Sequence, residues 1–234
     1  SSDVCSSDLS SANNILLNNS GSITNAGTFN LSSNAGIDYT AGGRPAFTNT
    51  GILAKIGGSA TSVIGITNPI TFTNSGTLNA QAGTINYASV NTFDSGTLFT
   101  GAGTNLVTTN STFNGTVTSS SNLVLQSGNF GGAANLVGTT NWTGGSIVGA
   151  LTIPSGSTLV GTGGGVKTID GGGASLTNAG TVSWTGTGNL LMQNSATLTN
   201  SGTFDFQSDA GIDYTAGGRP AFTNTGTLAK IGGS

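Results

Sequence analysis

Histidine and glutamate are absent from the chain, and charged side chains of any kind are rare. The 234 residues include five lysines and arginines and eight acidic residues, all aspartate, which gives a net charge of −3. Such a chain, with a pI near 4.3, lacks the basic face that neutralises the phosphates of nucleic acids. We therefore exclude nucleic acid as a partner. Low net charge also argues against disorder, because disordered chains usually carry high net charge and show no periodicity.

Long apolar runs are also missing, and there is a single cysteine. No run approaches the roughly 20 residues that cross a bilayer, so we expect no membrane span. Cys5 lies in residues 1–9 (SSDVCSSDL), which resemble the conceptual translation of a sequencing adapter. We interpret residues 1–9 as an artefactual tail that is dispensable for folding, with a genuine polar N-terminal tail as the alternative.

One seven-residue motif dominates the rest: an apolar residue, Thr-Asn, a small residue, Gly-Thr and another apolar residue. Copies occupy residues 23–29 (ITNAGTF), 47–53, 72–78, 176–182, 198–204 and 222–228, with degenerate copies at 93–98 and 113–117. Asn and Gly tolerate left-handed backbone, whereas Thr and apolar residues favour strands, so each copy predicts a turn followed by a strand. Where copies are adjacent, we expect the asparagines to stack. The predicted structural turn residues are Asn25, Gly27, Asn49, Gly51, Asn74, Gly76, Asn178, Gly180, Asn200, Gly202, Asn224 and Gly226.

A longer repeat contains this motif. Residues 14–59 return at 189–234, and 34 of the 46 aligned positions are identical, at an offset of 175 residues. The spacing of equivalent glycines averages about 22 residues, so eight units fill the offset, and periods of this length are typical of solenoids. We therefore predict an all-β fold, a single right-handed parallel β-helix (β-solenoid) of about ten coils over residues 10–234. Because the first copy continues past residue 59, we expect this solenoid to be truncated at both ends.

Alternation within the predicted strands indicates which side chains enter the coil. The expected inward pairs are Phe29 with Leu31, Leu78 with Ala80, Ile85 with Tyr87, Leu123 with Leu125, and Phe204 with Phe206. Residues 127–173 are less regular and rich in glycine. We interpret them as the same solenoid with variable turns, and a flexible linker between two domains is the alternative.

The motif copies, together with residues 142–147 (WTGGSI), 151–154 (LTIP) and the turn at 80–84 (AQAGT), resemble the β-strand-repeat surface proteins of bacteria. Those proteins are similar to filamentous-haemagglutinin and autotransporter passenger solenoids. The resemblance covers nearly everything after residue 10. It implies a very large chain that is secreted or displayed at the cell surface, associated with the outer membrane. Because such proteins share coils and differ in what they bind, the resemblance leaves the ligand open.

Parallel β-helices also include polysaccharide-cleaving enzymes, so the acidic residues need attention. Paired carboxylates for glycoside hydrolysis must converge to roughly 5–10 Å. The aspartates of the repeats that have no arginine nearby in the sequence are isolated from one another. Asp38 with Arg44 recurs as Asp213 with Arg219, and this duplication favours an exposed loop ion pair over a catalytic site. The glycine runs at 163–165 and 171–173 complete neither a calcium nonapeptide nor a phosphate-binding loop. We predict no catalytic, cofactor-binding or metal-binding residues.

The aromatic residues allow two interpretations. In strands they usually belong to the core, but exposed ones can stack on sugars; the candidates are Trp142, Trp184, Tyr39, Tyr87 and Tyr214.

Two hypotheses for function remain open. In the first, the chain is a non-catalytic structural or adhesive rod segment of a large secreted or cell-surface bacterial protein, with surface glycans or other cells as partners. In the second, it is the scaffold of a secreted polysaccharide-active β-helix enzyme whose catalytic residues lie elsewhere. A Thr-rich ice-binding solenoid is a weaker third alternative, because its Thr-x-Thr pairs do not recur in register. Since bare solenoid ends leave strand edges unpaired, we also expect end-to-end self-association of this chain.

Overall fold

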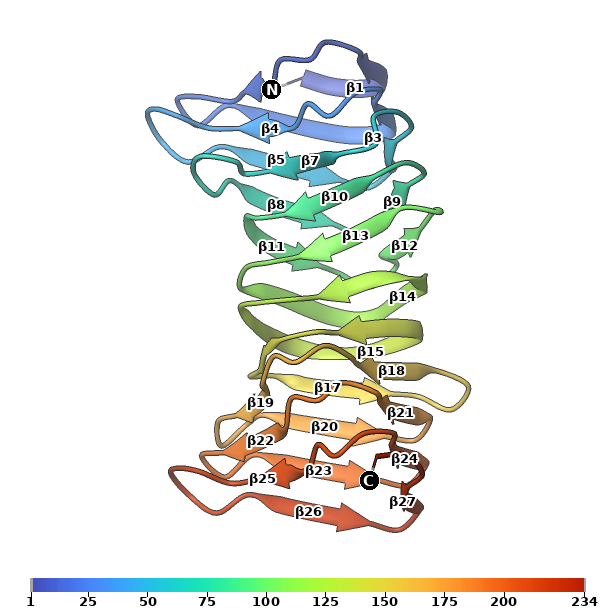
Figure 1. Ribbon diagram of the computed structural model, residues 1–234. Helices are drawn as coiled ribbons and strands as arrows, with labels where there is room; N and C mark the ends of the chain where they lie inside the picture. Colours follow the sequence, from blue (N-terminus) through green and yellow to red (C-terminus); the bar gives the residue numbers. More distant parts are fainter. Residues whose placement is uncertain (1, 234) are drawn as a thin grey trace.

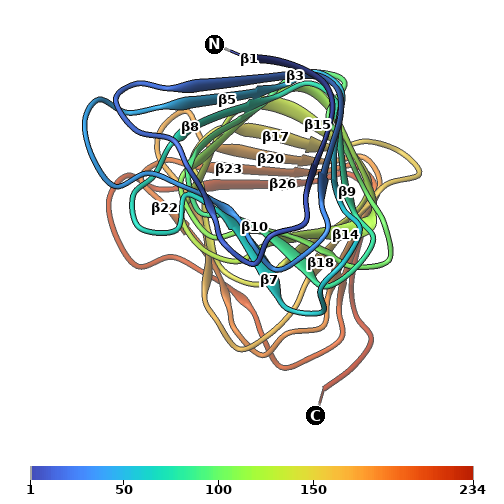
Figure 2. The ribbon, with the colours of Figure 1, turned by 90° about the horizontal axis from the view of Figure 1, so that it is seen from above.

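The computed structural model describes the backbone of residues 2–233 and the side chains of residues 8–233. Its strands pair in parallel and wind into a single β-solenoid of about ten coils, about 22 residues apart (Figure 1). Viewed from the N-terminal end, the chain runs clockwise as it recedes, which is the right-handed sense (Figure 2). The described backbone contains no helix, and therefore none of the length and hydrophobicity that a membrane span requires. The predicted fold class is confirmed.

The strands stack in three columns that run along the solenoid. The first column starts with β1 (Ser2–Leu9) on β3 (Ser22–Leu31) and continues through the strands that pair successively below them. These are β5 (Ala46–Asn49), β8 (Thr71–Asn74), β11 (Val90–Phe93), β14 (Ser111–Leu125), β15 (Asn129–Trp142), β16 (Gly145–Ile147), β19 (Lys167–Asp170), β22 (Leu190–Gln193) and β25 (Ile212–Asp213).

The second column continues in its upper half from the last residues of β3, and its lower half starts from residues 133–135 of β15, which directly follow the residues that continue the first column. It contains β6 (Ile52–Lys55), β9 (Thr77–Ala80), β12 (Leu98–Thr100), β17 (Ala150–Ile153), β20 (Ser175–Asn178), β23 (Thr197–Asn200) and β26 (Ala221–Asn224). The third contains β2 (Ile15–Leu16), β4 (Ile37–Asp38), β7 (Thr61–Ile64), β10 (Thr84–Tyr87), β13 (Thr104–Val107), β18 (Thr158–Gly161), β21 (Thr181–Trp184), β24 (Thr203–Phe206) and β27 (Thr227–Lys230). β14 and β15 bend around the corners and contribute to all three columns.

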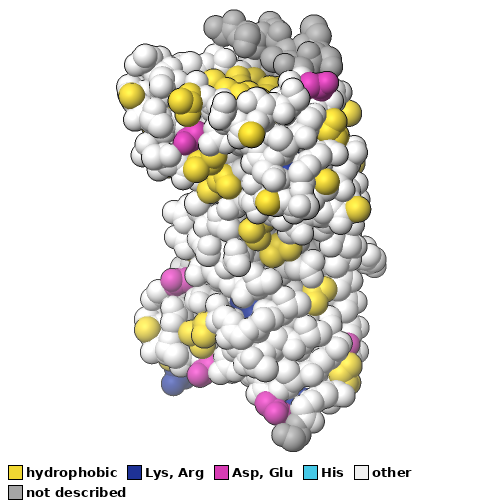
Figure 3. Space-filling model, turned by 45° about the horizontal axis from the view of Figure 1, so that its top comes forward, with side chains coloured by type: hydrophobic (Ala, Val, Ile, Leu, Met, Phe, Trp, Pro, Cys, Tyr) yellow, Lys and Arg dark blue, Asp and Glu magenta, His cyan; other side chains and the backbone are white. Residues whose placement is uncertain are grey.

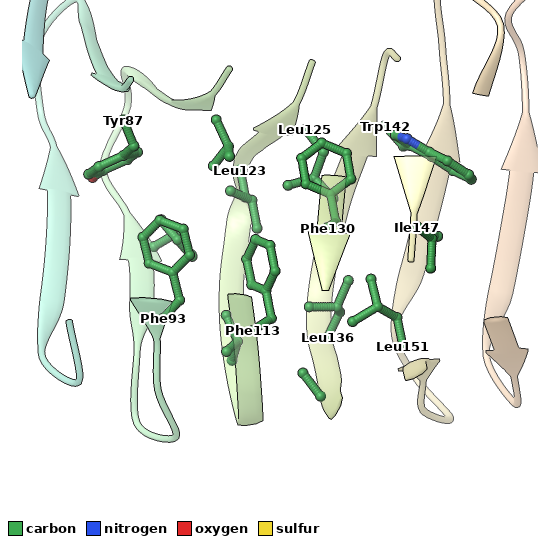
Figure 4. Close-up of a cluster of buried hydrophobic side chains, with 14 of the residues drawn as sticks. Tyr87, Phe93, Phe113, Leu123, Leu125, Phe130, Leu136, Trp142, Ile147 and Leu151 are labelled. Atoms are coloured by element: carbon green, nitrogen blue, oxygen red, sulfur yellow. The ribbon is translucent and has the colours of Figure 1, made fainter. Parts of the chain in front are cut away.

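The interior follows from the two-residue alternation of the strands. All ten side chains of the five predicted inward pairs are buried, and the residue between the members of each pair is only partly buried. Like residues lie above one another, so aromatic rings form rows along the axis (Figure 4). Phe72, for example, lies 5.3 Å from Phe47 of the coil above and 5.5 Å from Tyr87 of the third column, measured between ring centroids. The core is one continuous cluster.

The solenoid continues without interruption through residues 127–173. β15 pairs along its length with β14 on one side and with β16, β17 and β18 on the other. The alternative of a flexible linker in this stretch is therefore wrong. Glycines in this stretch, such as Gly132 and Gly138, have positive φ and allow the long strand to bend.

The strand pairings that join the two copies of the long repeat divide at β15. Successive pairings lead from β5 to β15, whose residues 129–130 pair with β16 and lead to β25, and whose residues 133–135 pair with β17 and lead to β26, the sequence copy of β5. Coil length varies, from 25 residues between Phe47 and Phe72 to 17 between Phe130 and Ile147. Strands β5 and β26 lie along the same side of the solenoid (Figure 2).

Residues 2–9 continue the sheet, although the sequence suggested that they lie outside it. As β1, they pair in parallel with β3, and the register shifts between Val4 and Ser6. The backbone N–H of Ser32 also donates to the carbonyl of Leu9 at 2.9 Å. The N-terminal edge of β3 is therefore covered rather than bare, while the origin of this segment and its dispensability for folding stay predictions.

We expect Phe72→Ala to reduce the free energy of unfolding by about 3–5 kcal/mol, because the truncated side chain leaves a cavity in a close-packed row. Thr73→Ala is the matched control, since Thr73 is the next residue of the same strand and is only partly buried. Its expected effect is within about 0.5 kcal/mol. Urea unfolding followed by circular dichroism measures both, and equal effects of the two substitutions would contradict the assignment of inward and outward faces.

Candidate functional site

Two ladders of asparagine side chains run inside the solenoid. In the first, Nδ2 of Asn25 donates to Oδ1 of Asn49, and Nδ2 of Asn49 donates to Oδ1 of Asn74, both at 2.6 Å. The second ladder links Asn178, Asn200 and Asn224 in the same direction, at 2.7 and 2.6 Å. Nδ2 of Asn25, Asn49, Asn178 and Asn200 also donates to a backbone carbonyl of the next coil, such as that of Ile52. The stacking expected for adjacent copies is present in both sets.

The position of these asparagines differs from the turn that the motif suggested. Asn49, Asn74, Asn178, Asn200 and Asn224 are the last residues of their strands, and Asn25 lies within β3. None of the six has a positive φ. The first ladder joins β3, β5 and β8, and the second joins β20, β23 and β26. Because the ladders lie at corners of the coil, their hydrogen bonds satisfy donors and acceptors that would otherwise be buried there without partners.

The motif glycines are required because the backbones of neighbouring coils approach each other closely at these positions, and not because the backbone is left-handed. Gly51, Gly76, Gly180, Gly202 and Gly226 do not have positive φ. A Cβ atom on Gly51 would lie 2.1 Å from the carbonyl oxygen of Gly27, and one on Gly76 equally close to that of Gly51. Any side chain there would separate the coils, because real Cβ atoms do not approach an oxygen so closely.

The first ladder ends where the motif degenerates. Nδ2 of Asn74 donates to Oγ1 of Thr97 at 2.9 Å, and this hydroxyl donates back to the carbonyl of Asn74. In the next coil Phe93 lies opposite Asn74, followed by Phe113. The column thus changes from polar to aromatic without a break in the strand pairing.

The two copies of the sequence DYTAGGRP form loops that connect β4 to β5 and β25 to β26. Both loops project from the same side of the rod (Figures 1 and 2). In each, the tyrosine hydroxyl donates across the loop to a glycine carbonyl, from Tyr39 to Gly42 at 2.6 Å and from Tyr214 to Gly217 at 2.5 Å. Arg44 and Arg219, the two arginines of the chain, are exposed in these loops.

The predicted ion pair between Asp38 and Arg44 is wrong. Asp38 is buried and accepts hydrogen bonds from the backbone N–H groups of Tyr39 and Thr67 and from the Thr67 hydroxyl. Burial alone would raise the pKa of this carboxyl group, but the hydrogen bonds from Thr67 and Tyr39 outweigh it and hold the pKa below the ordinary 3.8. In the second copy Asp213 is exposed and accepts from the backbone N–H of Tyr214.

Two lysines lie inside the solenoid, which the sequence analysis missed. Nζ of Lys55 donates to the carbonyls of Ser33 and Gly57 at 2.7 and 2.8 Å and contacts Oδ1 of Asn34 and Oγ of Ser62. Nζ of Lys167 donates to the carbonyl of Gly165 at 2.9 Å and lies 5.1 Å from the ring centroid of Trp184. Burial lowers the pKa of both lysines. The signal was available, because Lys55 follows Leu53 at the two-residue spacing of an inward pair.

The aromatic residues divide between the core and the surface. Trp142, Trp184 and Tyr87 are completely buried, so they belong to the core and cannot stack on a ligand. Tyr39 is partly buried and Tyr214 is 44% exposed, both in the duplicated loops. Of the candidates for sugar stacking, only these two reach the surface.

The acidic residues are dispersed along the rod. On the face shown in Figure 3 they lie singly, separated by uncharged surface. Among the described residues there is one ion pair, between Lys230 and Asp209 at 2.8 Å, and both of its side chains are more than half exposed. Within the described part of the chain, no three Cys, His, Asp or Glu side chains come together as a metal ion would require.

Comparison of the chain with protein-family models finds no match, and comparisons with curated proteins and with solved structures find none either.

We expect Asn49→Val to reduce the free energy of unfolding by about 2–5 kcal/mol. The substitution leaves Oδ1 of Asn74 without a donor and Nδ2 of Asn25 without its asparagine acceptor. Each buried group that loses its partner costs about 1–3 kcal/mol. Thr48→Val, at the preceding partly buried position, is the matched control and should cost less than about 0.5 kcal/mol. Chemical unfolding of both variants measures the difference. A cost below that of the control would show that the ladder adds nothing to stability.

The lowered pKa of Asp38 predicts that the stability of the protein depends on pH in the acid range. A carboxyl group whose pKa is lower in the native than in the unfolded state stabilises the protein above its ordinary pKa of 3.8, and this contribution is lost as the pH falls through the native value. Urea unfolding between about pH 2 and pH 6 should therefore show wild type losing stability faster than Asp38→Asn in acid. Parallel curves for Asp38→Asn would contradict the hydrogen-bonded role of this carboxylate.

Proposed function

We propose that the chain is a non-catalytic rod segment of a large secreted or cell-surface bacterial protein, with a structural or adhesive role. The observation that carries this proposal is the uninterrupted parallel ladder from β1 to β27 around one apolar core. Such a ladder makes a stiff body about 50 Å long, at about 4.8 Å for each of ten coils. Its polar side chains are used largely to join one coil to the next.

The adhesive role rests on the duplicated loops. Each presents a tyrosine ring, which the hydrogen bond from its hydroxyl group to a glycine carbonyl holds in place, and an exposed arginine in the same loop. Tyrosine offers a sugar an apolar face and arginine offers donors for its hydroxyl or carboxylate groups. Two identical loops about 40 Å apart, at about 4.8 Å for each coil between them, suit the repeating units of a surface glycan. Paired weak contacts of this kind gain avidity when both are made at once.

Beads coated with the chain test the adhesive role against a glycan array and against intact cells. We expect weak retention that falls at least tenfold in the double variant Tyr39→Ala with Tyr214→Ala. The matched control, Thr40→Ala with Thr215→Ala, alters exposed residues of the same loops and should retain wild-type binding. Equal retention by the two double variants would overturn the assignment of adhesion to these loops.

Incubation with a panel of neutral and acidic polysaccharides tests the non-catalytic part of the proposal. We expect no new reducing ends and no unsaturated products above the buffer blank. Product formation that depends on the folded chain would overturn the assignment of a non-catalytic role.

A further inference from the structure

The carbonyl groups of the loop at residues 39–45 are already used as hydrogen-bond acceptors. The loop rests on a turn of the coil before it, in which residues 19–20 have positive φ. The backbone N–H groups of this turn donate to the carbonyls of Ala41 at 3.1 Å and Gly43 at 2.7 Å. The carbonyl between them, that of Gly42, accepts from the tyrosine hydroxyl of the loop. Three consecutive carbonyls of the loop therefore have donors from within the chain.

The backbone N–H groups of the same stretch are free. Within the described part of the chain, those of residues 42–44 donate to no acceptor, and all three residues are exposed. The two N–H groups before them, of Thr40 and Ala41, donate to Oδ1 of Asn18 at 3.0 and 3.2 Å. The tip of the loop thus offers donors while its acceptors are occupied. Such a backbone favours a ligand that brings acceptor oxygens.

The two glycines of the loop hold it against the turn below. A Cβ atom on Gly42 would lie 2.2 Å from Oδ1 of Asn19, and one on Gly43 would lie 2.1 Å from Oγ of Ser20. Only residues without a side chain allow this contact. The backbone groups of the loop are therefore fixed before a ligand arrives, which lowers the entropy cost of binding.

The second loop, at residues 214–220, is built by the same hydrogen bonds. The carbonyls of residues 216–218 accept from the N–H groups of residues 194 and 195 and from the tyrosine hydroxyl. Among the described residues, the N–H groups of residues 217–219 again have no acceptor. The first loop keeps this arrangement between two coils, because Asn68 of the following coil donates to the carbonyl of Tyr39 at 2.9 Å. The arrangement is thus a property of the loop inside the stack.

The arginine of each loop adds a positive charge that has no partner. Arg44 and Arg219 are exposed, and neither makes a hydrogen bond or an ion pair with any residue that the structure describes. The three lysines, by contrast, all have partners, either inside the solenoid or in the ion pair at its surface. The positive charge that a ligand can reach therefore lies in the two loops.

We propose that each loop binds a carboxylate group of an acidic polysaccharide, such as a polymer of uronic acids. This inference rests on the proposed adhesive role of the loops and names the class of glycan. A carboxylate presents two acceptor oxygens, which the planar guanidinium of Arg44 binds as a fork. The free N–H groups of residues 42–44 supply further donors at the same loop tip. The tyrosine ring packs against the apolar face of the sugar.

The charge balance of the chain limits the charge density of this polymer. Each loop contributes a single arginine, and the chain as a whole has a net charge of −3. Nucleic acids and heavily sulfated glycans need a cluster of basic side chains to neutralise them, and a single arginine is no such cluster. A polymer that carries no more than one carboxylate on each sugar fits the loops.

Retention of polygalacturonate on beads coated with the chain tests the role of the carboxylate. The methyl-esterified polymer is the matched neutral ligand, and alginate and hyaluronate with their carboxyl-reduced forms extend the test to other uronic acids. We expect each neutral form to be retained at least tenfold more weakly than its acidic form. Equal retention of the acidic and neutral forms, or no retention of any acidic polymer, would overturn the inference.

Substitution of the arginines tests the residues. We expect Arg44→Gln with Arg219→Gln to weaken retention of polygalacturonate at least tenfold, and Arg44→Gln alone to weaken it at least threefold. Lys230→Gln is the matched control for the single variant, because it removes the same charge from an exposed side chain outside the loops. Circular dichroism checks that all variants fold. An equal loss in Arg44→Gln and Lys230→Gln would show that only net charge matters and would refute a site in the loops.

The tyrosine variants separate this inference from the proposed function. If Tyr39→Ala with Tyr214→Ala abolishes retention on the glycan array or on cells while the double arginine variant keeps it, the loops are adhesive but their ligand is neutral. The inference is then wrong and the proposed function stands. If neither double variant alters retention, the adhesive function of the loops fails as well.

An NMR titration of the isotope-labelled chain with trigalacturonate locates the contact without any substitution. We expect the amide resonances of residues 42–44 and 217–219 to shift as the ligand is added. Those of Thr40 and Ala41 should shift much less, because their N–H groups already donate to Asn18. Equal shifts of Thr40 and Ala41, or shifts confined to residues outside the loops, would contradict the proposed contact.

Discussion

The parallel hydrogen bonds between successive coils are the interaction upon which the rest of the structure depends. They fix a separation of about 4.8 Å between equivalent residues, and this separation decides which side chains are possible at each position. Asparagine amides reach one another at 2.6–2.7 Å, so they form ladders. The corner glycines tolerate no Cβ atom because the carbonyl of the previous coil is too close. Aromatic rings stack in rows for the same reason.

The duplicated segment shows how strongly a coil depends on its neighbours. Phe47 is buried and Phe222 is exposed, although the sequences around them are almost identical. Lys55 lies inside a shell of oxygen atoms, while Lys230 pairs with Asp209 at the surface. Asp38 is covered by Thr67, and its copy Asp213 is not. The burial and the hydrogen-bond partners of a coil in such an array therefore depend on the coils stacked against it, and not on its repeat sequence alone.

A rod built in this way places most of its specific polar chemistry in its interior. The ladders, the two buried lysines and Asp38 all join one coil to another, and the outer surface carries few charges (Figure 3). The duplicated loops are the exception, since they present Tyr39, Arg44, Tyr214 and Arg219 away from the body. This division between a uniform body and repeated projections is compatible with a spacer that also makes weak contacts along its length.

The sequence alone determined the solenoid, the inward pairs such as Phe29 with Leu31, and the equivalence of the asparagines within each set, because all three depend on local periodicity. Alternation along a strand decides whether a side chain points into the coil or out of it, regardless of which coil lies above. Only the tertiary structure decided that β1 covers β3, that Asp38 binds Thr67 and not Arg44, and that β15 pairs with β16, β17 and β18. These features depend on the length of each coil, which decides which residues of neighbouring coils lie opposite one another. Coil lengths that range from 17 to 25 residues cannot be read from the average spacing.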